Sequence, residues 1–376
     1  MRAFVHLRTT LVILTCCLVA PATAYEFRYL LQRDAVHTWM AAQALRCAAA
    51  AETWKDIVDC EDQNLESAPA VLYAAAPAGN TLTLTVSDVE KAVIWPDDPV
   101  RELRWYKLYR IGLWSWRLAV DNCGRRIEGI HKGLRCSSHY GPMQFLHAME
   151  SERELAAADT KEAILDWIQY AYSVAGNDSG DSGFNNDLPY CATINQVYGR
   201  DSKFAKAMMP YGDTGFPCVK DGPPWRMSTP FSFSCIIRSS SCWETITPND
   251  EGIRLAALGA VLHVIQDSYA KGHTSRGNDT ADSVALFECN PIKQFQLYGE
   301  QDHDVHRSAD KFPKRMVGCG DEAVDGPVTA SAKILKLYAA GAPWSDVDIY
   351  LRQRVFLLDA QKNHPAGTTE LMRRRN

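Results

Sequence analysis

Two histidines and an aspartate stand close together in the apolar segment from residue 252 to residue 276. His263 and Asp267 are four residues apart, and His273 follows Asp267 after five intervening residues. Residues at this four-residue spacing project from the same face of a helix, so a helix here places His263 beside Asp267. Gly272 favours the end of that helix just before His273. Imidazole and carboxylate groups together are typical zinc ligands, so the spacing predicts a metal site at a helix end.

Further histidines lie near acidic residues elsewhere in the chain. His306 and Asp310 repeat the four-residue spacing, His37 lies early in a predicted first helix, and His139 lies in a polar stretch. A single such pair is more often a carboxylate that orients a core histidine. Several pairs in one chain favour a metal cluster instead.

Two other histidines are open alternatives. His303 competes with His306 as a ligand, but it has no acid four residues later, so helical spacing favours His306. His147 and Glu150 follow His139 on a predicted helix, and we expect them to support ligands rather than to bind metal.

The spacing His263-x3-Asp267-x5-His273 resembles the central signature of the zinc-dependent phospholipase C and S1/P1 nuclease superfamily. Members of that family are exported, nearly all helical, and hold three zinc ions in a cleft. The segment DAVHTWMAAQAL, which contains His37, resembles the family's first helix. The other family ligands have counterparts in the same order, namely Asp98 or Asp97 in IWPDDP, His139 in SSHYGPMQFLHAM, and His306 with Asp310.

The resemblance implies three zinc sites and a role for each ligand. The first ion would be bound by Asp98 (or Asp97), His139, His263 and Asp267. The second would be bound by His273, His306 and Asp310. The third would be bound by His37, by Asp267 as a bridge, and by the backbone amino and carbonyl groups of Tyr25. Asp98 would position or deprotonate the attacking water. The chain departs from the family in having Tyr25 for the usual Trp and Asp310 for the usual Glu.

The N-terminal 24 residues have the pattern of a signal peptide. Arg2 and Arg8 precede a short apolar run, and Ala22-Thr23-Ala24 is a small-x-small cleavage site that would make Tyr25 the mature N-terminus. No later segment is long and apolar enough to predict a transmembrane helix. Ten cysteines follow the leader, and no Cys-x2-Cys pair exists, which favours disulfides over a thiolate zinc site. The sequence thus predicts a secreted or periplasmic protein.

A single, mainly α domain from residue 25 to residue 376 is expected, of the phospholipase C/P1 nuclease type. A long segment at about 176–250 is rich in Gly, Pro, Asn, Asp, Ser and Cys, which predicts a disulfide-rich irregular insertion. A short strand pair is expected within 69–85. Helices are expected within 28–60, 100–120, Met143–Ala158, Lys161–Ala175, 252–271, 281–300, 303–311, 327–341 and 345–360.

Composition restricts the possible functions without selecting one. The chain is 46% hydrophobic, which indicates a packed core, and its net charge of -5 includes no basic stripe for nucleic acid. Of the two activities that the resemblance implies, the lack of a basic stripe favours a peripheral phospholipase C that acts on phosphatidylcholine-like headgroups at a membrane surface, which is the first hypothesis. A single-strand nuclease is the alternative, because zinc ions can bind phosphate without help from basic residues. A non-catalytic exported metal-binding or toxin-like protein is the alternative of another class.

Overall fold

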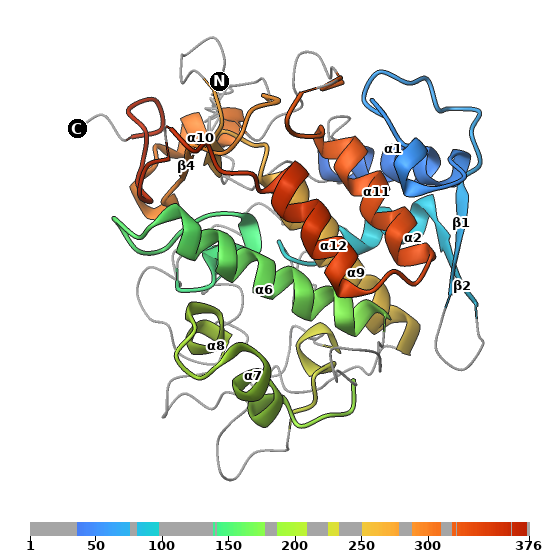
Figure 1. Cartoon of the computed structure of the whole chain (residues 1–376), viewed down its shortest axis with the longest axis horizontal. Helices are drawn as coiled ribbons and strands as arrows, with labels where there is room; N and C mark the ends of the chain where they lie inside the picture. The colour runs from blue at the N-terminus through green and yellow to red at the C-terminus, as the bar shows by residue number, and fades with distance from the viewer. Residues whose placement is uncertain are drawn as a thin grey trace, which may run out of the picture.

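The computed structural model shows a mainly helical chain in which a few short strands lie at the periphery (Figure 1). Its helices pack around one shared core rather than around separate ones. The structure describes residues 36–75, 81–97, 138–139, 141–176, 186–208, 225–232, 250–277, 288–309, 318–320, 322–361 and 363–373.

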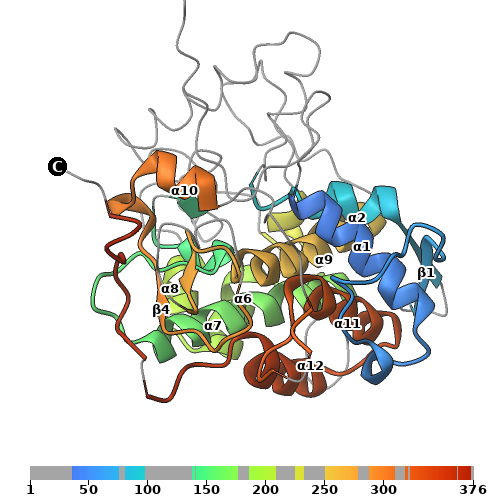
Figure 2. The ribbon, with the colours of Figure 1, turned by 90° about the horizontal axis from the view of Figure 1, so that it is seen from above.

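Helix α9 (Asp250–Asp267) runs through the middle of this core. Its neighbours are α1 (Val36–Ala50), α2 (Val86–Ala92), α6 (Ala157–Gly176) and α11 (Pro327–Ala339), which surround it in Figure 2. Small apolar residues on several faces of α9 allow these close approaches. At the tightest point, a Cβ added to Gly259 would lie 2.1 Å from the backbone carbonyl of Ala92, so only glycine fits against α2.

The contact between α1 and α11 is reinforced by the segment that follows α1. After α1 the chain turns back, and the disulfide Cys47–Cys60 joins the helix to the returning segment. Glu61 then lies at the start of α11, where its Oε1 accepts hydrogen bonds from the backbone N–H groups of Val328 (2.7 Å) and Thr329 (2.9 Å). A carboxylate at this position satisfies orphan helix donors and complements the helix dipole.

An aromatic layer lies on the other side of α6. Trp167 and Tyr170 of this helix pack against Phe231 at ring distances of 5.7 and 5.5 Å. The covering elements are α7 (Tyr190–Tyr198), α8 (Lys203–Met208) and the 3-10 turn Thr229–Ser232. The predicted irregular insertion at 176–250 therefore contains two short helices in its described part.

The remaining elements are short. Strands β1 (Val71–Ala75) and β2 (Thr81–Thr85) form the antiparallel pair expected within 69–85. Strands β3 (Thr274–Ser275) and β4 (Gln294–Phe295) form a second pair just after α9. The other helical elements in the described ranges are α10 (His303–Ala309), α12 (Trp344–Tyr350), a π-helical turn at Leu351–Val355, and 3-10 turns at Trp54–Asp56, Gln144–His147 and Tyr298–Glu300.

Two predicted helices are wrong. Instead of a helix over Met143–Ala158, a 3-10 turn at Gln144–His147 ends at Ala148, whose φ is +52°. The chain then pairs with a distant segment, because the N–H of Glu150 donates to the carbonyl of Gln296 (3.0 Å). That same pairing replaces the described part of the helix expected at 281–300. Tertiary hydrogen bonds have overridden local helix propensity at both places.

Within the described residues, the structure agrees with the predictions of disulfides and of no transmembrane helix. Cys289 and Cys319 form a second disulfide, and Cys191 is also disulfide-bonded. None of the helices in the described ranges is both long and apolar enough to cross a membrane. The proposed signal peptide at 1–24 and the helix expected at 100–120 lie outside the described residues.

Asp166 on α6 gives the fold a pH-dependent weakness. Burial and the nearby Glu162 carboxylate raise the pKa of Asp166 to about 7. The unfolded chain ionises this group near pH 4. Folding therefore becomes less favourable as pH rises from about 4 to about 7. We expect Asp166→Asn to raise Tm by about 2–4 °C at pH 8, the effect of about 1 kcal/mol, with a smaller gain at pH 5.

Thermal melts at the two pH values test this expectation. Asp201→Asn is the matched control, because Asp201 borders the same cleft between α6 and α8 but is fully exposed. An equal change in Tm at both pH values for Asp166→Asn would contradict the assignment.

Candidate metal centre

The last turn of α9 carries the first two members of a buried cluster. His263 and Asp267 lie on one face of the helix, as their spacing predicts, and His263 Nε2 is 3.0 Å from Asp267 Oδ2. Neither side chain has any solvent exposure. The other ring nitrogen, His263 Nδ1, faces the carbonyl of Val93 at 2.8 Å. That contact keeps a proton on Nδ1, so Nε2 is the nitrogen that faces the cluster and could bind a metal ion on losing its proton.

The chain turns sharply after α9 and brings His273 back to Asp267. The N–H of His273 donates to the carbonyl of Ala270 (2.9 Å), and the hydroxyl of Thr274 donates to the carbonyl of Ser268 (2.6 Å). The His273 ring then lies with Nδ1 3.6 Å from Asp267 Oδ2. Both histidines of the sequence motif therefore lie beside the carboxylate of its aspartate.

Helix α1 contributes His37, which lies at the start of the helix where α1 passes α9. Its ring stacks on that of His263 with the centroids 4.1 Å apart. His37 Nε2 lies 3.2 Å from Asp267 Oδ1, the oxygen that His263 does not contact. Asp267 thus has one oxygen toward His263 and the other toward His37, which is the arrangement that a bridging carboxylate requires.

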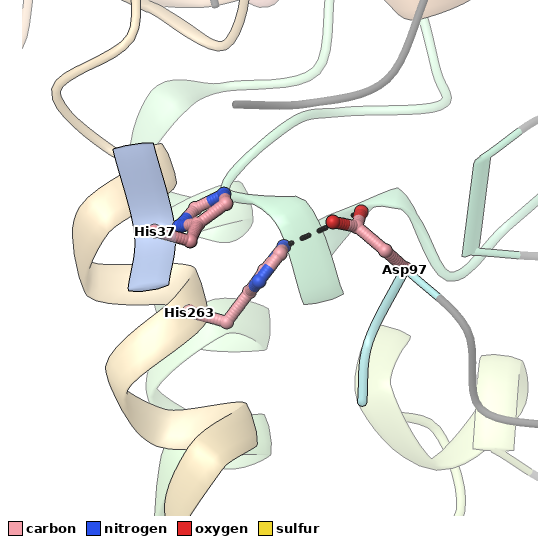
Figure 3. Close-up of side chains that lie close together, drawn as sticks. All are labelled: His37, Asp97 and His263. Carbon is pink, nitrogen blue, oxygen red and sulfur yellow. Dashed lines mark ion pairs between the residues drawn. The ribbon is translucent and has the colours of Figure 1, made fainter. Parts of the chain in front are cut away.

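Asp97 follows the turn after α2 and faces the cluster from the opposite side (Figure 3). Its Oδ1 lies 3.6 Å from His263 Nε2, 3.9 Å from His139 Nε2 and 4.0 Å from His147 Nδ1. Within the described residues, neither Asp97 oxygen makes a hydrogen bond, although the side chain is buried. Ligands around a tetrahedral zinc ion lie about 3.3 Å apart, which follows from bond lengths of about 2.0–2.1 Å. A shared cation explains these separations better than a hydrogen bond does.

His147 is the member of the cluster that the sequence did not assign as a ligand. Its Nδ1 lies 3.0 Å from Asp267 Oδ2 and 3.1 Å from His263 Nε2. The 3-10 turn that ends at Ala148 points the ring inward. With a helix predicted over this segment, we expected His147 to support a ligand rather than to bind metal. The sequence spacing does not distinguish His139 from His147 as a ligand, so the ligand role of His147 follows only from the 3-10 turn.

The remaining predicted ligands divide into two groups. His139 is buried with its ring centroid 4.5 Å from that of His147, and His306 of α10 stacks on His273 at 5.4 Å. The structure thus brings together His37, Asp97 (which was the alternative to Asp98), His139, His263, Asp267, His273 and His306, and it adds His147. The predicted ligands Tyr25, Asp98 and Asp310 lie outside the described residues, as does the side chain of His303.

The electrostatic balance of the cluster suits a cation. Burial raises the pKa of a carboxyl, but the charge of His263 and the contacts with the other neighbouring histidines together outweigh it and lower the pKa of both Asp97 and Asp267. Burial lowers the pKa of His263, but the two carboxylates reverse this and raise it to about 9. Burial lowers the pKa of His147 to about 3 and that of His306 to about 4. These two rings are therefore neutral and keep lone pairs for a metal ion.

Three overlapping groups of side chains in this cluster have the composition and spacing of a metal site. In each group, one ligand atom per residue lies within 4.8 Å of the others. The groups are His37, Asp97 and His263, then Asp97, His139 and His147, and then His147, His263 and Asp267. These buried histidine and aspartate groups could hold a metal ion, and the nitrogen-and-carboxylate donor set suits a divalent transition metal.

Comparison with known proteins does not extend this description. No family model matches the chain, and no curated protein and no solved structure matches it either. The metal centre therefore rests on the geometry of its own residues.

We expect His147→Ala to weaken zinc binding strongly, because it removes a ligand between Asp97 and Asp267. A 100-fold loss of affinity would remove about 2.7 kcal/mol of zinc-dependent stabilisation when zinc is in excess. The measurement is the rise in Tm when zinc is added to chelator-treated protein. His364→Ala is the control, since His364 is exposed and belongs to none of the three ligand groups. An undiminished zinc effect in His147→Ala would exclude this residue as a ligand.

Proposed function

We propose that this chain is an exported zinc-dependent phosphodiesterase of the kind that the sequence resembles, the phospholipase C and S1/P1 nuclease superfamily. The observation that carries the proposal is one buried cluster built from five separate segments. These segments supply His37, Asp97, His139 with His147, His263 to His273, and His306, in the order of the family's ligands. Two disulfides agree with an oxidising compartment, which is where an exported protein folds.

The cluster suggests how ligands divide among the ions. One ion would be held by Asp97, His147, His263 and Asp267, with His147 in the place that the sequence gave to His139. The distances of 3.0–4.0 Å among these groups support that division. A second ion would be held by His273 and His306 together with Asp310. A third would be held by His37 and Asp267 together with the mature N-terminus at Tyr25.

The residues then have separate chemical tasks. When bound, zinc ions lower the pKa of water and neutralise charge on phosphoryl oxygens during displacement. Asp97 faces the cluster without a hydrogen bond inside the described part of the chain, so it is the carboxylate that can orient water and accept its proton. Asp267 contacts His263 with one oxygen and His37 with the other, so it keeps these two ligands in a fixed relative position. His147 and His306, which are neutral, leave the positive charge of the ions available to the substrate phosphate.

The substrate is a phosphodiester, and a phosphatidylcholine-like lipid is the preferred one. The chain is slightly acidic and its sequence shows no basic stripe, which disfavours an extended nucleic-acid surface. A single-strand nuclease is the second candidate, because the metal ions themselves would bind the phosphate. An exported metal-binding protein without activity is the candidate from a different class.

We expect the mature protein to hydrolyse lecithin faster than single-stranded DNA, and to lose activity with chelator and regain it with zinc. Asp267→Asn should lower kcat by about 10²–10³-fold or more, the size of effect seen when one electrostatic group is removed from an active site. Asp201→Asn, which changes an exposed carboxylate, should leave activity unchanged.

Parallel assays on both substrates, with zinc content measured on the same samples, distinguish the candidates. Faster cleavage of DNA would support the nuclease. Bound zinc without cleavage of either substrate would support the non-catalytic protein, and full activity in metal-free protein would refute the metal-dependent mechanism.

A further inference from the structure

Four histidines of the cluster have an uncharged acceptor facing their Nδ1 atom. His263 Nδ1 faces the carbonyl of Val93, and His273 Nδ1 faces the carbonyl of His147. Two other rings face glutamine side chains instead of backbone. These glutamines are Gln266 and Gln301, and both are buried.

Gln266 holds His37 across the contact between α9 and α1. Its Oε1 lies 2.7 Å from His37 Nδ1, while His37 Nε2 lies 3.2 Å from Asp267 Oδ1 on the cluster side. The amide of Gln266 is itself held by α11, because its Nε2 donates to the Ser331 hydroxyl at 3.5 Å. That hydroxyl donates in turn to the carbonyl of Pro327 (2.7 Å). The support of His37 therefore extends through three helices.

Gln301 holds His306 in the same manner on the other side of the cluster. Its Oε1 lies 2.6 Å from His306 Nδ1, and its Nε2 donates to the carbonyl of Gly272 at 2.6 Å. A carbonyl only accepts, so this second bond fixes which end of the amide faces the ring. Gly272 precedes His273, so one glutamine ties His306 to the turn that carries its stacked neighbour.

The amide oxygen determines which ring nitrogen can bind a metal ion. Since an amide oxygen accepts but never donates, the facing Nδ1 must carry the proton and Nε2 must keep its lone pair. Metal-binding histidines are commonly fixed by such a partner, and losing the partner costs about 10–100-fold in metal affinity. A neutral partner also leaves the ligand a neutral imidazole, so it adds no negative charge beside the ions.

We propose that Gln266 and Gln301 are positioning residues of the metal centre, which set the tautomer and the orientation of His37 and His306. This inference rests on the metal centre of the proposed function, but not on the reaction or its substrate. It assigns a role to two buried amides that the ligand motif in the sequence does not include.

The test measures metal affinity in the full mature protein without reference to activity. Chelator-treated wild type, Gln266→Leu and Gln301→Leu are titrated with zinc against a competing chelator, and with cobalt(II) to follow the absorption bands that report coordination geometry. We expect each leucine variant to bind its weakest ion about 10–100-fold less tightly, with altered cobalt bands.

Gln296→Leu is the matched control. Gln296 is equally buried and also makes two side-chain hydrogen bonds, but both go to Thr369 and neither goes to a histidine. This variant should lose stability while keeping the metal affinity and the cobalt spectrum of the wild type. A general effect of removing a buried amide would lower metal affinity in all three leucine variants alike.

Two variants of Gln266 separate positioning from packing. Gln266→Glu keeps an acceptor at the same reach and should retain at least wild-type zinc affinity. Gln266→Asn keeps the amide but shortens the side chain, so it should lose affinity as the leucine variant does. These two also decide the question if Gln266→Leu does not fold.

The outcomes separate this inference from the proposed function. If the wild type binds no zinc or cobalt, the metal centre itself is refuted. If the wild type binds metal and the Gln266 and Gln301 variants bind it as tightly as Gln296→Leu does, the metal centre stands and the positioning role is wrong. If Gln266→Glu fails to keep the affinity, hydrogen bonding to His37 is not what Gln266 supplies.

Discussion

A fully buried carboxylate, Asp267, is the constraint on which the centre of the structure depends. An ionised group without solvent costs several kcal/mol unless charges or hydrogen bonds compensate it. Here the compensation comes from rings on α1, the 3-10 turn, α9 and the turn after it, namely His37, His147, His263 and His273. Four segments must therefore meet at one point, and a cation there would satisfy all of them together.

The surrounding helices explain how such a point can be buried. α9 approaches α2 at Gly259 closely enough to exclude any side chain, and α6 and α11 pack on its other faces. Ligands held on packed helices keep their geometry better than ligands on loops do. The supporting acceptors are likewise backbone carbonyls and amide side chains within the packed interior, such as the carbonyl of Val93 and the amide of Gln266. The same helix contacts that form the hydrophobic core thus also position the ligands of the site.

The function is inferred from the site rather than from the fold, because a fold alone hosts many activities. The donor set of imidazoles and two carboxylates favours zinc, and clustered zinc favours phosphoryl transfer. The metal centre depends on distances within the cluster, whereas recognition of the substrate depends on surfaces beyond it.

The sequence by itself determined the local part of the site. His263 and Asp267 had to be neighbours, because helical geometry fixes the side chains of residues four apart. The strand pair within 69–85 was predicted from local composition, because that segment is rich in Thr and interrupted by Gly. Only the tertiary structure decided that His147 contacts Asp267, 120 residues away, because that contact depends on a turn at Ala148 and on backbone pairing between Glu150 and Gln296. Periodicity predicted a helix over His147, and long-range hydrogen bonds, which no local pattern encodes, replaced it.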